Sequence, residues 1–406
     1  MIRLLGKCIA GLILGLQVAG AAPAFELTVV EPSATSYATF QSHNQKVVAN
    51  ERGYFMTLIR TRDEPFLAQN WRLLRSQDGG KHFDVVYDAT DATNPPPIET
   101  DSNNNIYLAR TDYTDGNGYL YFFEAAKDYE DPRITTIPGG AAGKVALLLD
   151  EAHDCLYYAP HNNRFYRLGL DGTVHENFEI VRGGPHAGLQ YPLLRKDDGG
   201  AIHYAWTSQQ NGVYMYWDIH HMLRPPGASS WQNLDGTALT LPVVADDTGA
   251  ATRISLDDEY ESFTWLSSFT LKGGKAHFLY LTQSQPPRQN YVRRDSATGV
   301  EEVRVRLDGL YLLSGLLVAP DATAESPLYL VSGYQGQLKA RVSHDNGDTW
   351  QPYAEHEGVF NLYSLGGCNT VTDDGYIVGS FTDQKAGDGL LSRESVVYFY
   401  RLKVGE

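Results

Sequence analysis

Three residues in this sequence combine a side chain that can transfer protons with a position in a loop or at the end of a strand. His186 lies in the Gly- and Pro-rich stretch Gly-Gly-Pro-His-Ala-Gly, Tyr191 follows five residues later, and His43 lies in Ser-His-Asn-Gln-Lys. Imidazole and phenol groups act as acids or bases when their surroundings adjust the pKa. We take all three as candidate catalytic residues. The alternatives are inert surface histidines and a Tyr191 ring packed between sheets.

A second set of residues could bind a polar, oxygen-rich ligand. Arg253 can pair bidentately with a carboxylate, and Lys144 can attract one as a point charge. Amides and carboxylates can hydrogen-bond hydroxyl groups, and an indole ring can stack on a sugar. A salt bridge to one of the acidic residues that follow it is the alternative role for Arg253. The substrate-binding candidates are Arg253, Lys144, Asn94, Glu261, Trp265 and Asn369.

The run Trp-Asp-Ile-His-His at positions 217–221 contains side chains that bind metals in other proteins. Side chains alternate between the two faces of a strand, so only Asp218 and His220 share a face, and His221 points the other way. We expect a buried hydrogen bond between Asp218 and His220, with His203 nearby, rather than a zinc site. The acidic positions 257–261 lack the spacing of a calcium loop. No metal or other cofactor is predicted, and bound calcium is left open.

A repeated structural unit must position these residues, because one pattern recurs along the chain. A short apolar strand, a turn of Asp, Asn and Gly, and a second strand rich in Tyr, Leu and Ala appear at 46–60, 96–110, 144–160, 191–206, 267–280, 314–333 and 366–381. The second strands begin near 54, 106, 155, 201, 275, 328 and 376, mostly 46 to 53 residues apart. This period is typical of four-stranded propeller blades. The sequence therefore predicts an all-β, seven-bladed β-propeller, with an irregular β-sandwich as the alternative.

The two ends of the chain are expected to share one blade. A third strand with alternating apolar and polar residues follows each copy of the repeat, and the last copy reaches the C-terminus without a fourth strand. The early segment 26–32 is a strand without a blade of its own. We expect this N-terminal strand to complete the final blade, which would close the ring and remove an exposed sheet edge. The predicted domain is a single propeller over residues 25–406, with the substrate face formed by residues just before each inner strand.

One interval in the repeat is longer than the others. The fourth and fifth second strands lie 74 residues apart, and the extra residues fall within 237–265, the segment that carries Arg253 and Glu261. Long loops inside a compact domain are usually functional or disordered. We expect this insertion to form one wall of a cleft.

The first 24 residues have the features of a cleaved signal peptide. Arg3 and Lys7 precede a short apolar run, and Ala22-Pro23-Ala24 supplies small residues for cleavage. The run is too short to span a bilayer, and no later segment is long and apolar enough. We expect a secreted or periplasmic protein that begins near Phe25. Cys155 and Cys368 remain in that chain; they could pair, but two buried thiols are the favoured interpretation.

The net charge of the chain limits the classes of molecule that it is expected to bind. The chain has a formal net charge of −16 and no basic cluster, which argues against nucleic acid and anionic membranes. A few local Arg or Lys side chains could still bind an anionic sugar. We expect a polysaccharide or oligosaccharide partner and a monomeric protein.

Two short motifs are the most specific in the chain. Residues 76–83 and 343–350 both match Ser-x-Asp-x-Gly-x-x-aromatic, and a degenerate third copy ends at Trp231. In such a turn Ser and Asp accept backbone N–H bonds, Gly takes the left-handed conformation, and the aromatic ring packs between blades. With these motifs and the seven-fold spacing, the chain resembles the sialidase-like, Asp-box (BNR-repeat) β-propeller superfamily. Its layout is similar to that of the propeller polysaccharide lyases that cut ulvan.

The resemblance implies a carbohydrate-active protein, and three functions stay open. Propeller lyases use His and Tyr near the starts of inner strands with Arg steering a uronate, although positions 93–96 lack the histidine of their His-Asn-x-Pro signature. Sialidases carry an early Arg-Ile-Pro motif that this chain lacks. We favour a polysaccharide lyase acting on a uronate-containing glycan by β-elimination. The alternatives are a glycoside hydrolase that uses Glu261 with Glu99 or Asp101, and a sugar-binding module without catalysis.

Overall fold

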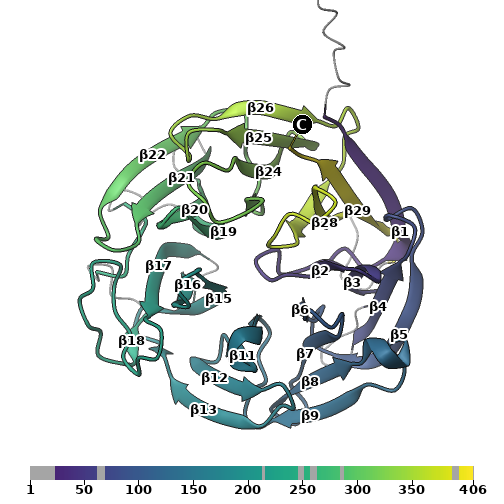
Figure 1. Ribbon diagram of the computed structural model, residues 1–406, viewed down its shortest axis with the longest axis horizontal. Coiled ribbons are helices and arrows are strands. Elements are labelled where there is room, and N and C mark those ends of the chain that lie inside the picture. Colours follow the sequence, from purple (N-terminus) through teal and green to yellow (C-terminus); the bar gives the residue numbers. More distant parts are fainter. Residues whose placement is uncertain are drawn as a thin grey trace, which may run out of the picture.

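The computed structural model describes residues 23–61, 69–212, 215–245, 251–256, 263–283, 288–385 and 393–405. These residues form a seven-bladed β-propeller, as the repeat predicts (Figure 1). The blades are antiparallel sheets arranged radially, with the first strand of each next to the central axis. Among the described residues, the helices are the 3-10 turns η1 (Ala125–Lys127) and η2 (Glu151–His153), and none could cross a bilayer.

The first three blades each contain four strands in sequence order, from the axis outwards. Blade one contains β2 (Val47–Asn50), β3 (Gly53–Ile59), β4 (Gln69–Ser76) and β5 (Asp84–Ala92). Blade two contains β6 (Ile98–Thr100), β7 (Ile106–Asp112), β8 (Asn117–Phe123) and β9 (Arg133–Ile137). Blade three contains β10 (Val145–Asp150), β11 (Cys155–Pro160), β12 (Arg164–Gly169) and β13 (Val174–Glu179). The second strands therefore begin at, or one residue from, the predicted positions.

The remaining blades follow the same plan, with one exception. Blade four has three strands, β15 (Ala187–Lys196), β16 (Ile202–Gln210) and β17 (Tyr216–Arg224). Blade five contains β19 (Thr264–Lys272), β20 (Lys275–Thr282), β21 (Arg288–Asp295) and β22 (Glu301–Leu307). Blade six contains β23 (Leu316–Val318), β24 (Leu328–Tyr334), β25 (Gln337–Ser343) and β26 (Gln351–Glu355). Blade seven contains β27 (Leu362–Gly367), β28 (Tyr376–Asp383), β29 (Ser395–Lys403) and the N-terminal β1 (Phe25–Ala34).

Strand β1 closes the ring, as predicted. It pairs antiparallel with β29, from Phe25 opposite Leu402 to Ala34 opposite Ser395, and forms the outer edge of blade seven (Figure 1). The junction with blade one is sealed by Phe399, whose ring lies 5.3 Å from that of Tyr54. Both chain ends therefore contribute to one sheet, which leaves no open edge between the first and last blades.

The two Ser-x-Asp-x-Gly turns form the expected hydrogen bonds. Gly80 N–H donates to Ser76 Oγ at 2.9 Å, and the amides of Lys81 and His82 donate to Asp78 Oδ1. The turn at 343–350 repeats the pattern, with Gly347 N–H donating to Ser343 Oγ at 2.7 Å. Gly80 and Gly347 have φ values of 84° and 97°, which a side chain would strain. These serine and aspartate groups are therefore used within the turns.

Part of the inserted segment completes blade four, a role that the sequence did not predict. Residues 252–254 lie along β17, where the fourth strand of blade four would be, whereas Trp265 belongs to β19 of blade five. The expected cleft wall stays a prediction, because positions 246–250 and 257–262 lie outside the described residues. Arg253 is bridged to His220, and the nearby Gln232 to Leu223. Farther along, β18 (Val243–Val244) pairs with β14 (Val181–Arg182) beside blade three. The insertion therefore completes the outer edge of blade four.

Blade interfaces form the core, and Trp231 is a clear example. Its buried indole ring lies 5.2 Å from Phe165 of blade three and 6.3 Å from Tyr204 of blade four. The degenerate third motif therefore places its aromatic residue between blades. Cys155 and Cys368 are both buried free thiols, which confirms the favoured interpretation of the cysteines.

Candidate active site at the channel mouth

A segment of the chain crosses the central channel before blade one begins. In this channel segment (residues 37–46), Thr39 Oγ1 lies 2.8 Å from Thr382 Oγ1 of blade seven. On the side of blade three, the Gln41 amide donates to the Gly143 carbonyl, and Asn44 Nδ2 donates to the Val145 carbonyl. Hydrogen bonds to two other blades thus hold the segment inside the ring. The opening at the amino ends of the inner strands is called the channel mouth below.

The channel segment brings His43 into contact with blade four. The imidazole is 4% exposed and meets the ring of Tyr191 edge to face, with 5.0 Å between the ring centroids. Neither ring nitrogen has a hydrogen-bond partner among the described residues. Burial lowers the pKa of His43 well below its usual value, and the positive charges of Lys46 and Lys144 lower it further. His43 is therefore neutral at physiological pH.

Tyr191 occupies an irregular position in the long inner strand β15. Its φ of 50° is unusual for a residue with a side chain, and the register with β16 shifts between Gln190 and Leu193. The ring packs 4.1 Å from Trp265, and the Tyr216 hydroxyl donates to the Tyr191 hydroxyl at 3.3 Å. A strained backbone at a buried polar cluster is typical of functional sites. The contact with Trp265 of blade five also shows that the Tyr191 ring packs between blades, which is the alternative role considered from the sequence.

Lys144 supplies the positive charge at the mouth. It immediately precedes β10, and its Nζ lies 4.9 Å from the centroid of the Tyr191 ring, within cation–π range. Its side chain is partly exposed, whereas those of His43 and Tyr191 are buried. Lys144 is therefore the member of this group best placed to meet a charged ligand.

His161, which we did not select from the sequence, is paired with Lys144 through the backbone. His161 N–H donates to the Lys144 carbonyl at 2.9 Å, and Lys144 N–H donates to His161 Nδ1 at 3.2 Å. Burial and the charge of Lys144 lower the pKa of His161 to about 3. Because Nδ1 accepts a hydrogen bond, the neutral ring carries its proton on Nε2. His161 thus offers an N–H donor close to Lys144, whose positive charge acts on the His161 ring.

Tyr113 is a second residue at the mouth that the sequence analysis did not select, and it lies next to Gly143. A Cβ atom at Gly143 would collide with the Tyr113 hydroxyl and lie 3.6 Å from His161 Cε1. The Tyr113 hydroxyl and the His161 ring therefore border the same space beside the glycine. Burial raises the pKa of Tyr113, so its hydroxyl keeps its proton. The arrangement places a phenol donor and an imidazole donor together beside Gly143.

The predicted residues divide into those that meet at the mouth and those that do not. His43, Tyr191, Lys144 and Trp265 contact one another directly or through Tyr191. Asn94 joins them as a support, since its Nδ2 donates to the Gly143 carbonyl at 2.7 Å. These residues come from blades one to five. The propeller therefore brings side chains that are distant in the sequence together at the channel mouth, as predicted.

His186 and Arg253 lie outside this group. His186 is exposed just before β15, at the mouth end of that strand and five positions before the buried Tyr191. Arg253 lies beyond β16 and β17, about 14 Å outwards from the inner strand at the usual strand spacing. Arg253 therefore lies away from the mouth, whereas the catalytic role of His186 stays a prediction. Glu261 lies outside the described residues.

The structure also alters the interpretation of Asn369 and of the histidine run. Asn369 follows β27 instead of preceding it, so it lies at the opposite end of the channel. Asp218 does not pair with His220 as expected: it accepts a hydrogen bond from Ser255 Oγ at 2.6 Å, and His220 Nδ1 lies 3.0 Å from Thr252 Oγ1. The described residues contain no group of three or more His, Cys, Asp or Glu side chains arranged to hold a metal ion.

Glu99 and Asp101, two of the carboxylates considered for hydrolysis, do not lie at the mouth. Asp101 accepts hydrogen bonds from the backbone amides of Asn103 and Asn105 and from the Tyr107 hydroxyl, so it stabilises a turn. Glu99 lies in β6 at the opposite opening of the channel. Burial raises the pKa of Glu99 to about 8, and nearby Arg195 only partly opposes this shift.

The raised pKa of Glu99 predicts a pH-dependent stability effect. The folded protein holds this proton up to about pH 8, whereas an unfolded chain releases it near pH 4.5. The contribution of Glu99 to the free energy of unfolding is therefore full below pH 4.5 and is lost as the pH rises through 8. Glu99→Gln cannot ionise, so its stability relative to the wild type should increase between pH 4.5 and 8. Urea unfolding at pH 4.5 and pH 8.5 measures this, and an equal difference at both pH values would contradict it.

Comparison with known proteins supports the fold. No protein-family model matches the sequence, and a search of curated proteins also gives no match. Among solved structures, an ulvan lyase of polysaccharide lyase family PL25, bound to -[GlcA(1-4)Rha3S]-, is similar with a TM-score of 0.64 and 12% identity over 90% of this chain and 95% of that chain. The polysaccharide lyase Uly1 is similar with a TM-score of 0.58 and 10% identity over 94% of this chain and 99% of that one.

A protein of unknown function from Dyadobacter fermentans is also similar, with a TM-score of 0.52 and 10% identity over 94% of this chain and 98% of the other. At these identities the similarity establishes a shared propeller fold and no more. A shared fold does not define the chemistry of the mouth residues.

Proposed function

We propose that this protein is a polysaccharide lyase that cleaves a uronate-containing glycan by β-elimination at the channel mouth. The observation that carries the proposal is the Lys144 ammonium group beside the neutral imidazoles of His43 and His161 and the ring of Tyr191. A cation near neutral hydrogen-bond donors suits an anionic substrate. The charged groups that most affect the pKa of His43 are all basic residues, although the chain as a whole is strongly negative.

The substrate would be held through its carboxylate. Lys144, which is partly exposed, attracts the uronate carboxylate, and the Nε2–H of His161 donates a hydrogen bond to it. Neutralising this carboxylate makes the C5 proton more acidic and stabilises the negative charge that develops when the proton leaves. Positive charge at the carboxylate is therefore the main catalytic contribution of the site.

The proton transfers are assigned to an imidazole and a phenol. His43 takes the C5 proton once the bound uronate reaches its ring, which is 4% exposed in the unbound protein. Burial and nearby cations lower the pKa of His43, and the carboxylate of the uronate offsets the effect of the cations, which increases the basicity of the ring. The electron pair forms the C4–C5 double bond as the C4–O4 bond breaks. Tyr113, whose raised pKa keeps it protonated, donates its proton to the leaving O4. Tyr191 packs against both His43 and Lys144 and positions them.

A non-catalytic sugar-binding role is the second candidate, and the aromatic rim favours it. Phe40, Phe263 and Tyr311 are partly exposed and pack against the buried cluster of Tyr191 and Trp265. Exposed ring faces are stacking platforms for sugars. The same rim would bind the substrate of a lyase, so catalysis distinguishes the two functions.

An assay on defined polysaccharides tests the proposal. The protein from Phe25 onwards is incubated with glycans that contain glucuronate, galacturonate or mannuronate, and with a neutral glucan as control. Ultraviolet absorbance from a C4–C5 unsaturated product is expected for at least one uronate glycan and not for the neutral glucan. New reducing ends without this absorbance would indicate a hydrolase. Retained binding without cleavage would indicate a binding module.

A further inference from the structure

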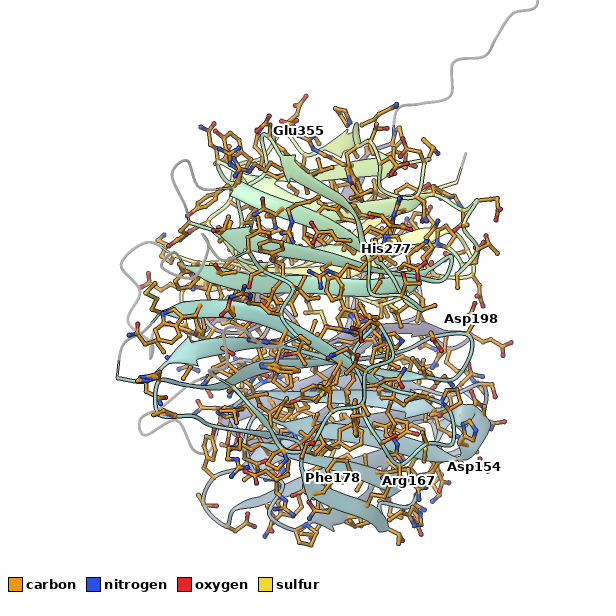
Figure 2. The ribbon with its side chains drawn as sticks, turned by 90° about the vertical axis from the view of Figure 1, so that its left-hand side faces the viewer. Asp154, Arg167, Phe178, Asp198, His277 and Glu355 are labelled. Carbon is orange, nitrogen blue, oxygen red and sulfur yellow. The ribbon has the colours of Figure 1, made fainter. Side chains whose placement is uncertain are left out.

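The opposite end of the channel contains a cavity of about 430 Å³, separate from the mouth. Along β10 the two ends of the channel lie about 13 Å apart, because Leu149 follows Val145 by four positions in an extended strand. Figure 2 shows Asp154 and Asp198, from the turns after β10 and β15, on this same face of the propeller. All seven blades contribute to the lining of this exit cavity, through residues that include Gln45, Glu99, Leu149, Arg195, Thr270, Ala319 and Asn369.

Arg195 is the central charged group of the exit cavity. Its guanidinium donates to the Leu194 carbonyl at 2.8 Å and to Asn369 Oδ1 at 2.7 Å, and it lies 5.4 Å from the centroid of the Phe269 ring. In the part of the chain that the structure describes, Arg195 makes no ion pair with a carboxylate. A partly buried guanidinium held in place without a negative partner is suited to binding an anion.

Neutral hydrogen-bonding groups surround Arg195. The Gln45 amide is fixed at the cavity wall, because its Oε1 accepts from Asn369 N–H at 2.7 Å and its Nε2 donates to the Ile98 carbonyl. Glu99 also lines the cavity and keeps its proton at neutral pH, since burial raises its pKa. A protonated carboxyl donates a hydrogen bond without repelling an anion.

The other titratable groups around the cavity do not cancel the charge of Arg195. Lys196 is paired with Asp150 of blade three at 2.6 Å. Asp198 and Asp321 lie in the turns at its rim and are exposed, and burial raises the pKa of the Cys368 thiol, which therefore stays neutral. The interior of the cavity thus keeps a net positive charge.

We propose that the exit cavity binds a small carboxylate-bearing sugar, with Arg195 pairing with the carboxylate and Asn369, Gln45 and Thr270 near the hydroxyl groups. Its volume lies within the range of small-ligand sites and accommodates a monosaccharide or disaccharide. The apolar lining from Leu149 and Ala319 gives the sugar ring a surface to pack on. This site is distinct from the mouth and does not depend on catalysis there.

Calorimetric titration with sodium D-glucuronate at pH 6.5 tests this site. Methyl glucoside provides the sugar without the carboxylate, and acetate and inorganic phosphate provide anions without the sugar. Saturable binding of glucuronate, at least tenfold tighter than binding of the other three probes, is expected. No saturable binding of glucuronate, or equal binding of phosphate, would overturn the proposal.

Two substitutions separate the charge of Arg195 from its structural role. Arg195→Gln removes the cation, and Asn369→Asp places a carboxylate where it would pair with Arg195 and keep the fold intact. Both should weaken glucuronate binding at least tenfold, whereas Lys144→Met at the mouth should leave this binding in place. Unchanged affinity in Asn369→Asp, with an unaltered melting temperature, would contradict the assignment.

The pH dependence gives an independent readout. Above about pH 8 the ionised Glu99 competes for Arg195 and repels the ligand, so affinity should fall as the pH rises through this value. Glu99→Gln should bind glucuronate equally well at pH 6.5 and 9. A wild-type affinity that does not change over this range would contradict the role of Glu99. Because the mouth variant Lys144→Met is included, failure here can be told apart from failure of the proposed lyase activity.

Discussion

Lys144→Met should lower kcat/KM on a cleaved uronate glycan by about 100- to 1,000-fold, which is the usual cost of removing one preorganised electrostatic stabiliser. The substitution removes the ammonium group beside Tyr191 while keeping an unbranched side chain that reaches the Cε position. Negative charge builds up on the uronate as the C5 proton leaves, so Lys144 stabilises the transition state more than the bound substrate. The substitution should therefore lower kcat as well as the affinity for the glycan. Initial rates of unsaturated product formation measure the effect.

Two controls define the result for Lys144. Lys144→Arg keeps the positive charge and should retain more activity than the methionine variant. Lys81→Met removes a lysine from an exposed turn on blade one and should stay close to the wild type. A Lys144→Met rate within threefold of the wild type would contradict the role of this residue in the proposed mechanism.

Phe399→Ala should have the largest effect on stability, a loss of about 3 to 5 kcal/mol in the free energy of unfolding. Phe399 is 1% exposed and packs against Tyr54 at 5.3 Å and against Phe83 at 5.1 Å. It therefore seals the interface between blades one and seven, where the ring closes. Denaturant unfolding followed by intrinsic fluorescence measures the change.

A matched variant on the surface tests whether closure is the cause. Val85 in β5 is 50% exposed, so Val85→Ala should change the free energy of unfolding by no more than about 0.5 kcal/mol. Equal unfolding curves for Phe399→Ala and the wild type would show that this interface contributes little. In that case the ring would be held closed mainly by the pairing of β1 with β29.

The fold was predictable because each blade repeats the same local sequence pattern of strands and turns. Turn residues and strand alternation recur once in each blade, so second strands such as Ile106–Asp112 and Leu328–Tyr334 could be located from the sequence. The unpaired N-terminal strand then had only one edge to complete. The insertion was harder to predict, because short segments such as the bridge at Arg253 have no periodicity that shows where they pair.

The site was only partly predictable, for a topological reason. Our sequence reasoning considered residues just before each inner strand, and it identified His43 and Lys144 in this way. The turn between the second and third strands lies at the same end of the blade, because antiparallel strands reverse direction. Tyr113 and His161 lie in such turns, after β7 and β11. The predicted strand order alone therefore places both residues at the mouth end of their blades.

Other features depend on three-dimensional packing and leave no pattern in the sequence. The Gly- and Pro-rich sequence around His186 suggests a catalytic loop, whereas the structure shows an exposed side chain just before β15. The lowered pKa of His43 arises from burial and from cations on other blades. Arg195 lies on an inner strand, and only the closed ring brings it near Glu99 and Asn369.

The type of bond cleavage is the most direct test of the central claim. The protein is incubated with the uronate glycan in water enriched in oxygen-18, and the products are analysed by mass spectrometry. Elimination takes no oxygen from water, so we expect unlabelled fragments with an unsaturated uronate at the new non-reducing end. Saturated fragments that carry oxygen-18, or no cleavage of any uronate glycan, would contradict the account.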